Sequence, residues 1–222
     1  MCGRFAFFSP REALQAAFGD VPGLEFEPRY NIAPTQNVAV IRNINDQGRE
    51  AGLSRWGLIP FWAKDPSIGN RMINARAETL AEKPSFRQSY SRRRCLVLAS
   101  GFYEWRKQEQ GKQPYYISRQ DNQPFALAGL WDRWRTSDGE EIRSCTIVTT
   151  AANEFMSSMH LRMPVCLDSV TIDQWLDPDS SRGQLDEIVL GPQRMNLQAW
   201  PVSRKVNSPV NDSAELIEPV TA

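Results

Sequence analysis

Histidine and lysine are scarce in this chain of 222 residues, and long hydrophobic runs are missing. His160 is the single histidine, and the 26 basic residues comprise 21 arginines and 5 lysines. No apolar run approaches the ~18 residues that a membrane span requires, and no basic leader precedes a hydrophobic segment. We therefore expect a cytoplasmic protein with no membrane partner.

The cysteines show no spacing that is typical of paired metal ligands. Cys2, Cys95, Cys145 and Cys166 lie far apart in a chain without an export signal, and thiols inside cells stay reduced. Neither a nucleotide-binding glycine loop nor a helix-borne metal motif is found. The sequence thus predicts no disulfide, no metal site and no cofactor.

Net charge is also missing, because 26 acidic residues balance 26 basic ones. This balance argues against a protein that coats nucleic acid by bulk electrostatics. The excess of arginine still allows a small anion-binding groove, since the planar guanidinium suits bidentate phosphate contacts. The alternative is that these arginines form ordinary surface ion pairs. Hydrophobic content of 41% indicates a soluble globular protein, and we expect one domain over residues 1–222.

Short extended segments dominate the predicted secondary structure. Strands are expected at 37–42, 52–58, 95–99, 113–118, 125–134, 143–150 and 196–202. Helices are expected up to residue 18, from residue 153, and at 171–176 and 184–190. Loops are expected at 27–34 and 64–70, and turns at 111–112 and 137–139. This pattern predicts an α+β domain dominated by curled, barrel-like antiparallel β-sheet with a few peripheral helices.

The first predicted helix has a clear start signal. Ser9 is the expected cap, Pro10 lies in the first turn, and Glu12 completes a capping box. Gly19 is expected to end the helix.

Cys2 follows the initiator methionine, and its small side chain allows an aminopeptidase to expose it. A terminal cysteine carries an amine and a thiol on adjacent carbons, so it condenses with an aldehyde to an imine and then closes a thiazolidine ring. Reference pKa values of ~7.7–8.0 for the amine and ~8.5 for the thiol leave reactive forms of both near neutrality. The alternative is a frayed terminus, but the apolar residues 5–8 would hold Cys2 against the protein.

Glu104 and His160 are the candidate proton-transfer groups. Glu104 lies among aromatic residues, where burial would raise its carboxyl pKa; the alternative is a strand position that faces solvent. His160 is the one side chain with an unperturbed pKa between 5 and 8, although a lone histidine is often structural. Asn74 and Arg76 alternate with apolar neighbours, so an extended segment would project both to one side.

Six short segments occur in one order over nearly the whole chain. They are Met-Cys-Gly-Arg-Phe at 1–5, Arg-Tyr-Asn-Ile-Ala-Pro at 29–34, Ile-Asn-Ala-Arg-Ala-Glu-Thr at 73–79, Gly-Phe-Tyr-Glu-Trp at 101–105, Ile-Val-Thr-Thr-Ala-Ala-Asn at 147–153 and His-Leu-Arg-Met-Pro at 160–164. Together they resemble the SRAP family, the SOS-response-associated peptidases or abasic-site processing proteins. The resemblance implies a curled, β-rich domain that binds single-stranded DNA in a channel. It also implies capture of a ring-opened abasic sugar as a thiazolidine crosslink, which shields the lesion during the DNA damage response.

The resemblance also implies roles for individual residues. Cys2 would be the nucleophile, surrounded by Asn74, Glu104 and His160. The DNA-binding residues would be Arg4, Arg76 and Arg162 at phosphates, Pro34, Trp62 and Trp105 at bases, and Thr149 at the backbone. The expected partner is single-stranded DNA with abasic sites, bound by a monomer that joins the nucleoid. A channel along one strand needs only a local arginine lining, so zero net charge is no objection.

Other functions remain open at this point. A noncatalytic single-strand binding module would use the aromatic residues and arginines without Cys2, and a thiol peptidase would act on other proteins. The family name also implies self-processing, with the Cys2 thiol attacking the Met1 carbonyl, and a lyase-type activity is a further expectation. The alternative to self-processing is that a host aminopeptidase removes Met1.

Overall fold

The structure is a computed structural model that describes residues 2–44, 48–109, 111–136 and 138–221. Its strands are β1 (Phe5–Phe7), β2 (Arg29–Ile32), β3 (Asn37–Asn43), β4 (Arg49–Trp56), β5 (Asn74–Arg76), β6 (Arg94–Ala99), β7 (Gly101–Gln108), β8 (Gly111–Arg119), β9 (Phe125–Arg135), β10 (Glu141–Ala151), β11 (Arg162–Pro164), β12 (Cys166–Leu167) and β13 (Leu197–Pro201). The α-helices are α1 (Arg11–Phe18), α2 (Arg87–Arg92), α3 (Glu154–Ser157), α4 (Ser169–Leu176) and α5 (Arg182–Leu190). Short 3-10 helices are η2 (Pro66–Arg71), η3 (Ala77–Thr79), η4 (Arg204–Asn207) and η5 (Ala214–Ile217). The predicted α+β class is confirmed.

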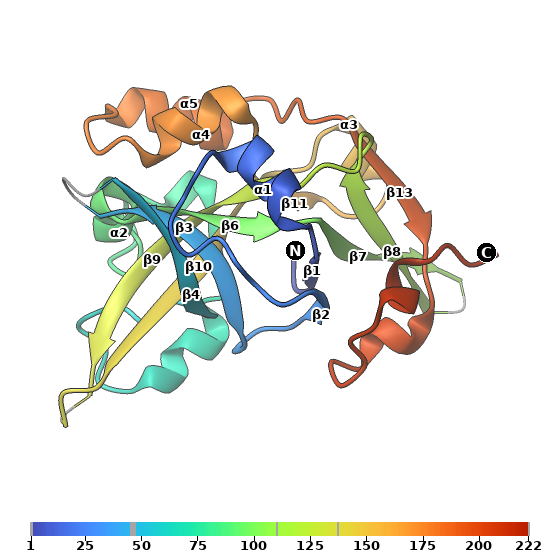
Figure 1. The fold of residues 1–222 in the computed structure, drawn as a ribbon, viewed down its shortest axis with the longest axis horizontal. Coiled ribbons are helices and arrows are strands. Elements are labelled where there is room, and N and C mark those ends of the chain that lie inside the picture. Colours follow the sequence, from blue (N-terminus) through green and yellow to red (C-terminus); the bar gives the residue numbers. More distant parts are fainter. Residues whose placement is uncertain (1, 45–47, 110, 137, 222) are drawn as a thin grey trace.

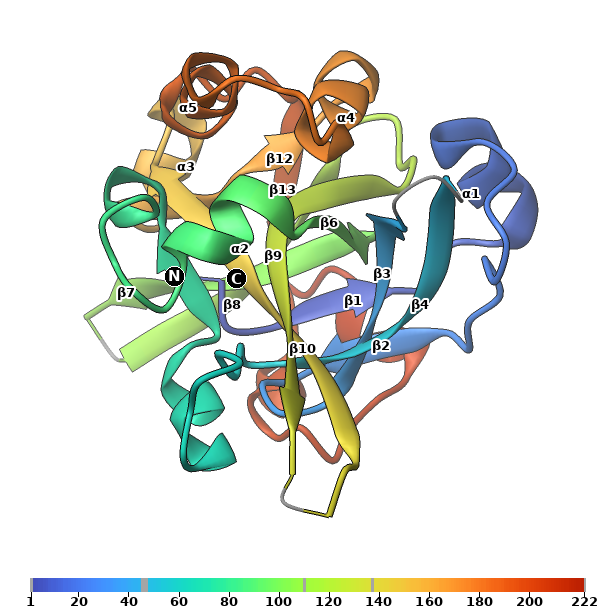
Figure 2. The same ribbon diagram turned by 90° about the vertical axis from the view of Figure 1, so that its left-hand side faces the viewer.

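Five strands close into a barrel, and Figure 2 labels all of them. The strands β4, β3, β6, β9 and β10 pair in that order, and β10 returns to β4. The β10–β4 pairing is parallel, whereas the other four are antiparallel. Strand β6 is buried along its whole length because the barrel interior covers one face and α4 packs near the other. The predicted curled antiparallel sheet is therefore confirmed.

A second sheet, in the order β13-β8-β7-β1-β2, carries the start of the chain (Figure 1). Strand β1 lies between β7 and β2, and its residues are buried, as expected for the apolar run. Gly101 in β7 allows close packing, because a Cβ there would fall 2.3 Å from the Tyr116 ring. Residues from the C-terminal segment, such as Val206 and Leu216, pack against this sheet.

Several local predictions are wrong for identifiable reasons. The loop expected at 27–34 contains β2, because the prolines flank this strand and do not interrupt it. Ser9 does not cap α1, since Pro10 occupies the cap position and the Ser9 hydroxyl lies 2.8 Å from the Ser100 hydroxyl. The helix itself is confirmed and ends at Gly19, which has a φ of 82°.

One predicted turn and one predicted loop also differ from the structure. Residues 111–112 begin β8 and do not form a turn. The loop expected at 64–70 contains η2, whose first turn is capped by the Asp65 carboxylate accepting from the Ser67 N–H at 2.8 Å. The turn at 137–139 includes Ser137, which lies outside the described residues, as does Met1.

Across the described ranges, none of the helices combines the length and the apolar character that crossing a membrane demands.

Candidate functional site

Cys2 is fully buried where the second sheet meets the barrel. The N–H of Tyr103 donates to the Arg4 carbonyl at 3.0 Å, so the first residues run antiparallel to β7, toward Glu104. Asn74, in β5 beside the barrel strand β10, donates from Nδ2 to the Cys2 carbonyl at 2.8 Å. Residues that are distant in the sequence, at positions 2, 74 and 104, are thus brought together.

The surroundings of Cys2 favour the neutral form of its thiol. Burial raises the thiol pKa far above its ordinary value, and the negative charge of Glu104 acts in the same direction. The positive charge of the N-terminus opposes this rise, and a hydrogen bond from the Arg4 backbone opposes it to a smaller extent. Burial therefore disfavours the thiolate that the reference pKa would allow near neutrality.

Glu104 and Asn74 present polar atoms to this buried space. Glu104 is 3% exposed, so the alternative of a solvent-facing position is wrong. Its Oε2 lies 3.4 Å from the backbone N of Trp105. Asn74 Oδ1 is buried and has no hydrogen-bond partner among the described residues. An amide acceptor is therefore open beside Cys2.

Arg162 binds a carboxylate and a barrel strand at once. Its Nη2 donates to the Thr149 carbonyl at 2.6 Å and to Glu78 Oε2 at 3.0 Å, while its Nη1 donates to Glu78 Oε1. This guanidinium lowers the pKa of the Glu78 carboxyl. Thr149 pairs with Arg76 of β5 on one side and with β11 on the other. The residues predicted at 76, 149 and 162 therefore lie next to one another, and Arg76 is two residues from Asn74 in the same strand, β5.

His160 is attached to the same edge. Its Nδ1 lies 2.9 Å from the backbone N and 3.2 Å from the carbonyl oxygen of Arg162. In the tautomer whose Nδ1 accepts from the Arg162 N–H, the proton is on Nε2. The ring is half-buried and belongs to the turn that precedes β11.

Arg4 and Trp105 contact the C-terminal segment. Arg4 donates from Nη1 to Asn31 Oδ1 and to the Val206 carbonyl, both at 2.7 Å, and burial lowers its pKa. Trp105 donates from its indole N–H to Asn207 Oδ1 at 2.8 Å. Both side chains thus have partners within the protein, and their contacts with DNA stay predictions.

Trp62 is held firmly at the surface. Its side chain is 46% exposed. The preceding residue, Phe61, donates its backbone N–H to Asp132 Oδ2 at 3.0 Å, and the following carbonyl, of Ala63, accepts from the Trp134 indole at 2.7 Å. An exposed indole with anchors on both sides is suited to stacking.

Pro34 is half-buried, and it precedes a strained residue. Thr35 has a φ of 75°, in the left-handed region that β-branched residues rarely adopt. Such strain persists where the surrounding structure holds it, and it gathers at functional sites.

The polar residues that hold the predicted site residues were missed from the sequence. Glu78 binds Arg162, Asn31 binds Arg4, and Asp132 binds the loop of Trp62. Glu78 and Asn31 lie within segments that resemble the family, so those segments were the available signal. Asp132 lies in an ordinary strand pattern and carried no signal.

Within the ranges that the structure describes, no group of three or more His, Cys, Asp or Glu side chains could hold a metal ion. The four cysteines are free thiols.

Comparisons with known proteins give consistent results. A family model described as SOS response associated peptidase (SRAP) matches residues 1–209. Abasic site processing protein YoqW of Bacillus subtilis (strain 168) is 44% identical over 223 residues, which cover 98% of this chain and 99% of that protein. Abasic site processing protein YedK of Escherichia coli (strain K12) is 34% identical over 229 residues, covering 99% and 100%. A solved structure of a protein from Bacteroides thetaiotaomicron superposes with a TM-score of 0.88 at 26% identity, covering 99% of this chain and 100% of that chain.

Proposed function

This chain belongs to the SRAP family, and we propose that it processes abasic sites in single-stranded DNA by forming a covalent crosslink through Cys2. The observation that carries the proposal is the fixed position of Cys2. A residue next to the start of a chain is usually mobile, yet this one is fully buried, bonded to Asn74 and adjacent to Glu104. Such placement suits a reacting group and not a frayed end.

The first chemical step is an attack of the Cys2 α-amine, free once Met1 is gone, on C1′ of the ring-opened sugar. The new C–N bond gives a carbinolamine. This intermediate loses water when a proton reaches its hydroxyl, and an imine remains. Glu104 takes the proton from the attacking nitrogen and returns it to the leaving hydroxyl. The open acceptor of Asn74 orients the amine, because an amine N–H needs such an acceptor.

The second step closes the ring. The Cys2 sulfur adds to the imine carbon, and the thiol proton passes to the nitrogen, so that a thiazolidine forms without any net loss of atoms. His160 donates to the sugar oxygen through Nε2, in the tautomer whose Nδ1 accepts from the Arg162 N–H. Positioned acid–base groups contribute ~10²–10⁴-fold each, and holding the amine beside the aldehyde contributes more.

DNA would reach this chemistry along the exposed side chains nearby. Arg76 is exposed and offers a phosphate contact, and Trp62 offers a stacking surface. Arg162 is paired with Glu78, so a phosphate would compete with that carboxylate for the guanidinium. Recognition by shape and stacking implies low preference for base sequence. We propose that the protein acts as a monomer.

A denaturing gel tests the proposal directly. Wild type, Cys2→Ala and Cys166→Ala are incubated with matched abasic and intact single-stranded oligonucleotides. We expect a heat-stable crosslink with abasic DNA for wild type and for Cys166→Ala, which removes a different half-buried thiol. Cys2→Ala should give none. An undiminished crosslink in Cys2→Ala would overturn the mechanism.

The same experiment separates the rival functions. A noncatalytic binding module predicts complexes that salt dissociates and no covalent product, because phosphate contacts weaken steeply with ionic strength. If the protein is a thiol peptidase that acts on other proteins, it should cleave unrelated peptides, which is measured with the same three proteins.

We further propose that the site removes Met1 itself. The Cys2 sulfur attacks the Met1 carbonyl, the amide between Met1 and Cys2 breaks to leave a thioester and the free Cys2 amine, and water hydrolyses the thioester to release methionine. Because these steps need proton transfer, the intact masses of Glu104→Gln and His160→Ala should show that Met1 is retained. Loss of Met1 from both variants would assign its removal to a host aminopeptidase.

A further inference from the structure

Strand β2 contains a bulge beside the start of the chain. The pairing with β1 slips by one residue, so Tyr30 and Asn31 together face Ala6 alone. A bulge leaves backbone groups that the ladder does not satisfy. The N–H groups of Tyr30 and Asn31 both donate to Oδ1 of Asp212, the second at 2.9 Å. One carboxylate from the C-terminal segment therefore closes the bulge.

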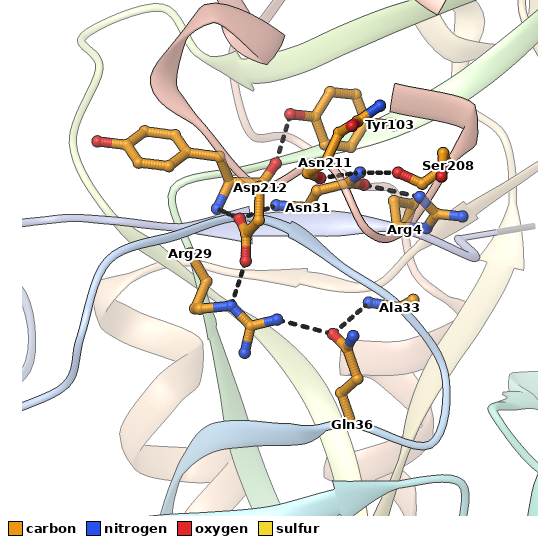
Figure 3. A network of polar contacts seen from close by, with 10 residues as sticks. Arg4, Arg29, Asn31, Ala33, Gln36, Tyr103, Ser208, Asn211 and Asp212 are labelled. Atoms are coloured by element: carbon orange, nitrogen blue, oxygen red, sulfur yellow. Dashed lines mark hydrogen bonds and ion pairs between the residues drawn. The ribbon is translucent and has the colours of Figure 1, made fainter. Parts of the chain in front are cut away.

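The bulge directs Asn31 at Arg4, two residues after Cys2. The Asn31 side chain has no exposed surface, and its Oδ1 accepts from Arg4 at 2.7 Å. Its Nδ2 donates to the carbonyls of Val206, Ser208 and Asn211 at 3.3, 3.0 and 2.7 Å (Figure 3). A buried amide with its donors and acceptor engaged fixes its neighbours, because moving any of them leaves a buried polar group unpaired.

We propose that residues 203–213 act as a strap that holds β1 and the preceding residues 2–4 in place, with Asn31 and Asp212 as its positioning residues. The effect on chemistry rests on the proposed function of Cys2.

The same carboxylate also reaches the strained turn. Arg29 donates from Nε to Asp212 Oδ2 and from Nη2 to Gln36 Oε1, the latter at 2.9 Å. Gln36 Oε1 also accepts the Ala33 N–H at 3.0 Å, which closes the turn around Thr35. Figure 3 shows this chain of contacts running from Asp212 to Gln36. The strap therefore couples β1 to the turn around Thr35, where Pro34 would hold a base.

Hydrogen exchange tests the strap without DNA. In full-length Asp212→Ala, amides in residues 4–7 and 29–33 should exchange at least about tenfold faster, because hydrogen bonds to a charged group are lost. Amides in β6 should exchange at the wild-type rate. Glu215→Ala is the matched control, since it removes an exposed ion pair with Lys205 from the same segment without touching the bulge. Unchanged exchange at 4–7 in Asp212→Ala would overturn the proposal.

Single-turnover crosslinking at saturating abasic oligonucleotide tests the positioning role. Asp212→Ala should lower the rate constant by roughly 10-fold to 100-fold, as expected for a misplaced reacting group. Asp212→Asn keeps the acceptor for the bulge and should recover most of the rate. A purely structural defect would lower the fraction that reacts but leave the rate constant unchanged.

A second variant guards against a simple failure of folding. Asn31→Asp keeps the acceptor for Arg4 but places a carboxylate against three carbonyls, and we expect the same fall in rate constant. Faster exchange together with a wild-type rate constant in both variants would overturn the positioning role. If wild type itself forms no crosslink, the proposed function fails, and exchange at 4–7 alone decides whether the strap exists.

Discussion

The barrel and the surroundings of Cys2 hold their residues by different means. In the barrel, β6 is joined by ladders to both neighbours, and its residues from Cys95 to Ala99 are apolar and fully buried. Around Cys2, distant segments meet through single polar side chains, with Asn74 bonded to residue 2 and Asn31 to residue 4. Truncating an apolar side chain weakens packing, whereas removing one of these side-chain amides leaves its buried hydrogen-bond partner unpaired. We therefore expect the barrel to set stability and, under the proposed function, the polar contacts to set the reactivity of Cys2.

The largest change in free energy should come from the barrel. Leu96→Ala removes a fully buried side chain from β6, so the free energy of unfolding should fall by about 2–5 kcal/mol. The crosslinking rate constant of the folded fraction should stay within about twofold of wild type, since the cavity lies away from the polar contacts. Denaturant titration and single-turnover crosslinking give the two values. If the crosslinking rate constant fell along with stability, the distinction between the barrel and the surroundings of Cys2 would be wrong.

The opposite pattern is expected at Asn74. Asn74→Ala removes the bond to the Cys2 carbonyl and the open acceptor beside it, so the crosslinking rate constant should fall by roughly 100-fold. Stability should change by less than about 1.5 kcal/mol, the usual net value of one hydrogen bond. Binding of intact single-stranded DNA, measured by fluorescence anisotropy, should stay unchanged. If Asn74→Ala lowered the crosslinking rate constant and the affinity for intact DNA by the same factor, Asn74 would act in DNA binding instead.

A smaller effect is expected at the exposed rim. Trp62→Ala should weaken binding of single-stranded DNA by about 1–3 kcal/mol through lost stacking. The rate constant at saturating DNA should remain near the wild-type value. Leu190→Ala is the control, because it removes an exposed apolar side chain from α5. Matching affinity losses in both variants would show that Trp62 does not stack on DNA.

The smallest effect concerns the thiols of the barrel wall. Burial raises the pKa of Cys145 from 9.0 to about 12, so the folded thiol keeps a proton that the unfolded thiol loses. At pH values between these two pKa values, unfolding releases a proton from this thiol. The free energy of unfolding therefore falls as pH rises, by about 1.4 kcal/mol per pH unit. Denaturant titrations at pH 8 and pH 10 should show a shallower fall for Cys145→Ala. If the free energy of unfolding depended on pH identically in wild type and Cys145→Ala, the pKa of this thiol would not be raised in the folded protein.

Local signals in the sequence predicted the parts of the fold that depend on local physics. Helix α1 has a proline start and a glycine stop, and β3 has an apolar run, so both were found. Strand β2 was missed because its bulge is closed by Asp212, about 180 residues later in the chain. No pattern within residues 27–34 indicates that Asp212 pairs with this segment.

The candidate site divides in the same way. Cys2, Asn74 and Glu104 were named from the sequence, because the types of residue in their segments carry the chemistry. Their meeting was expected only from the resemblance to the family, because no pattern within these segments shows how β5 and β7 face each other across two sheets. The supporting residues Glu78 and Asn31 escaped for the same reason, because each acts through a partner that is distant in sequence.

The most direct measurement is the position of the sugar on the crosslinked protein. Wild-type protein is reacted with abasic single-stranded DNA, treated with nuclease and with a thiol-alkylating reagent, and then digested after arginine and lysine. We predict that mass spectrometry finds the sugar fragment on residues 2–4, with the Cys2 thiol unavailable to the reagent and no free α-amine. A sugar fragment on a lysine peptide, with Cys2 alkylated, would contradict the account.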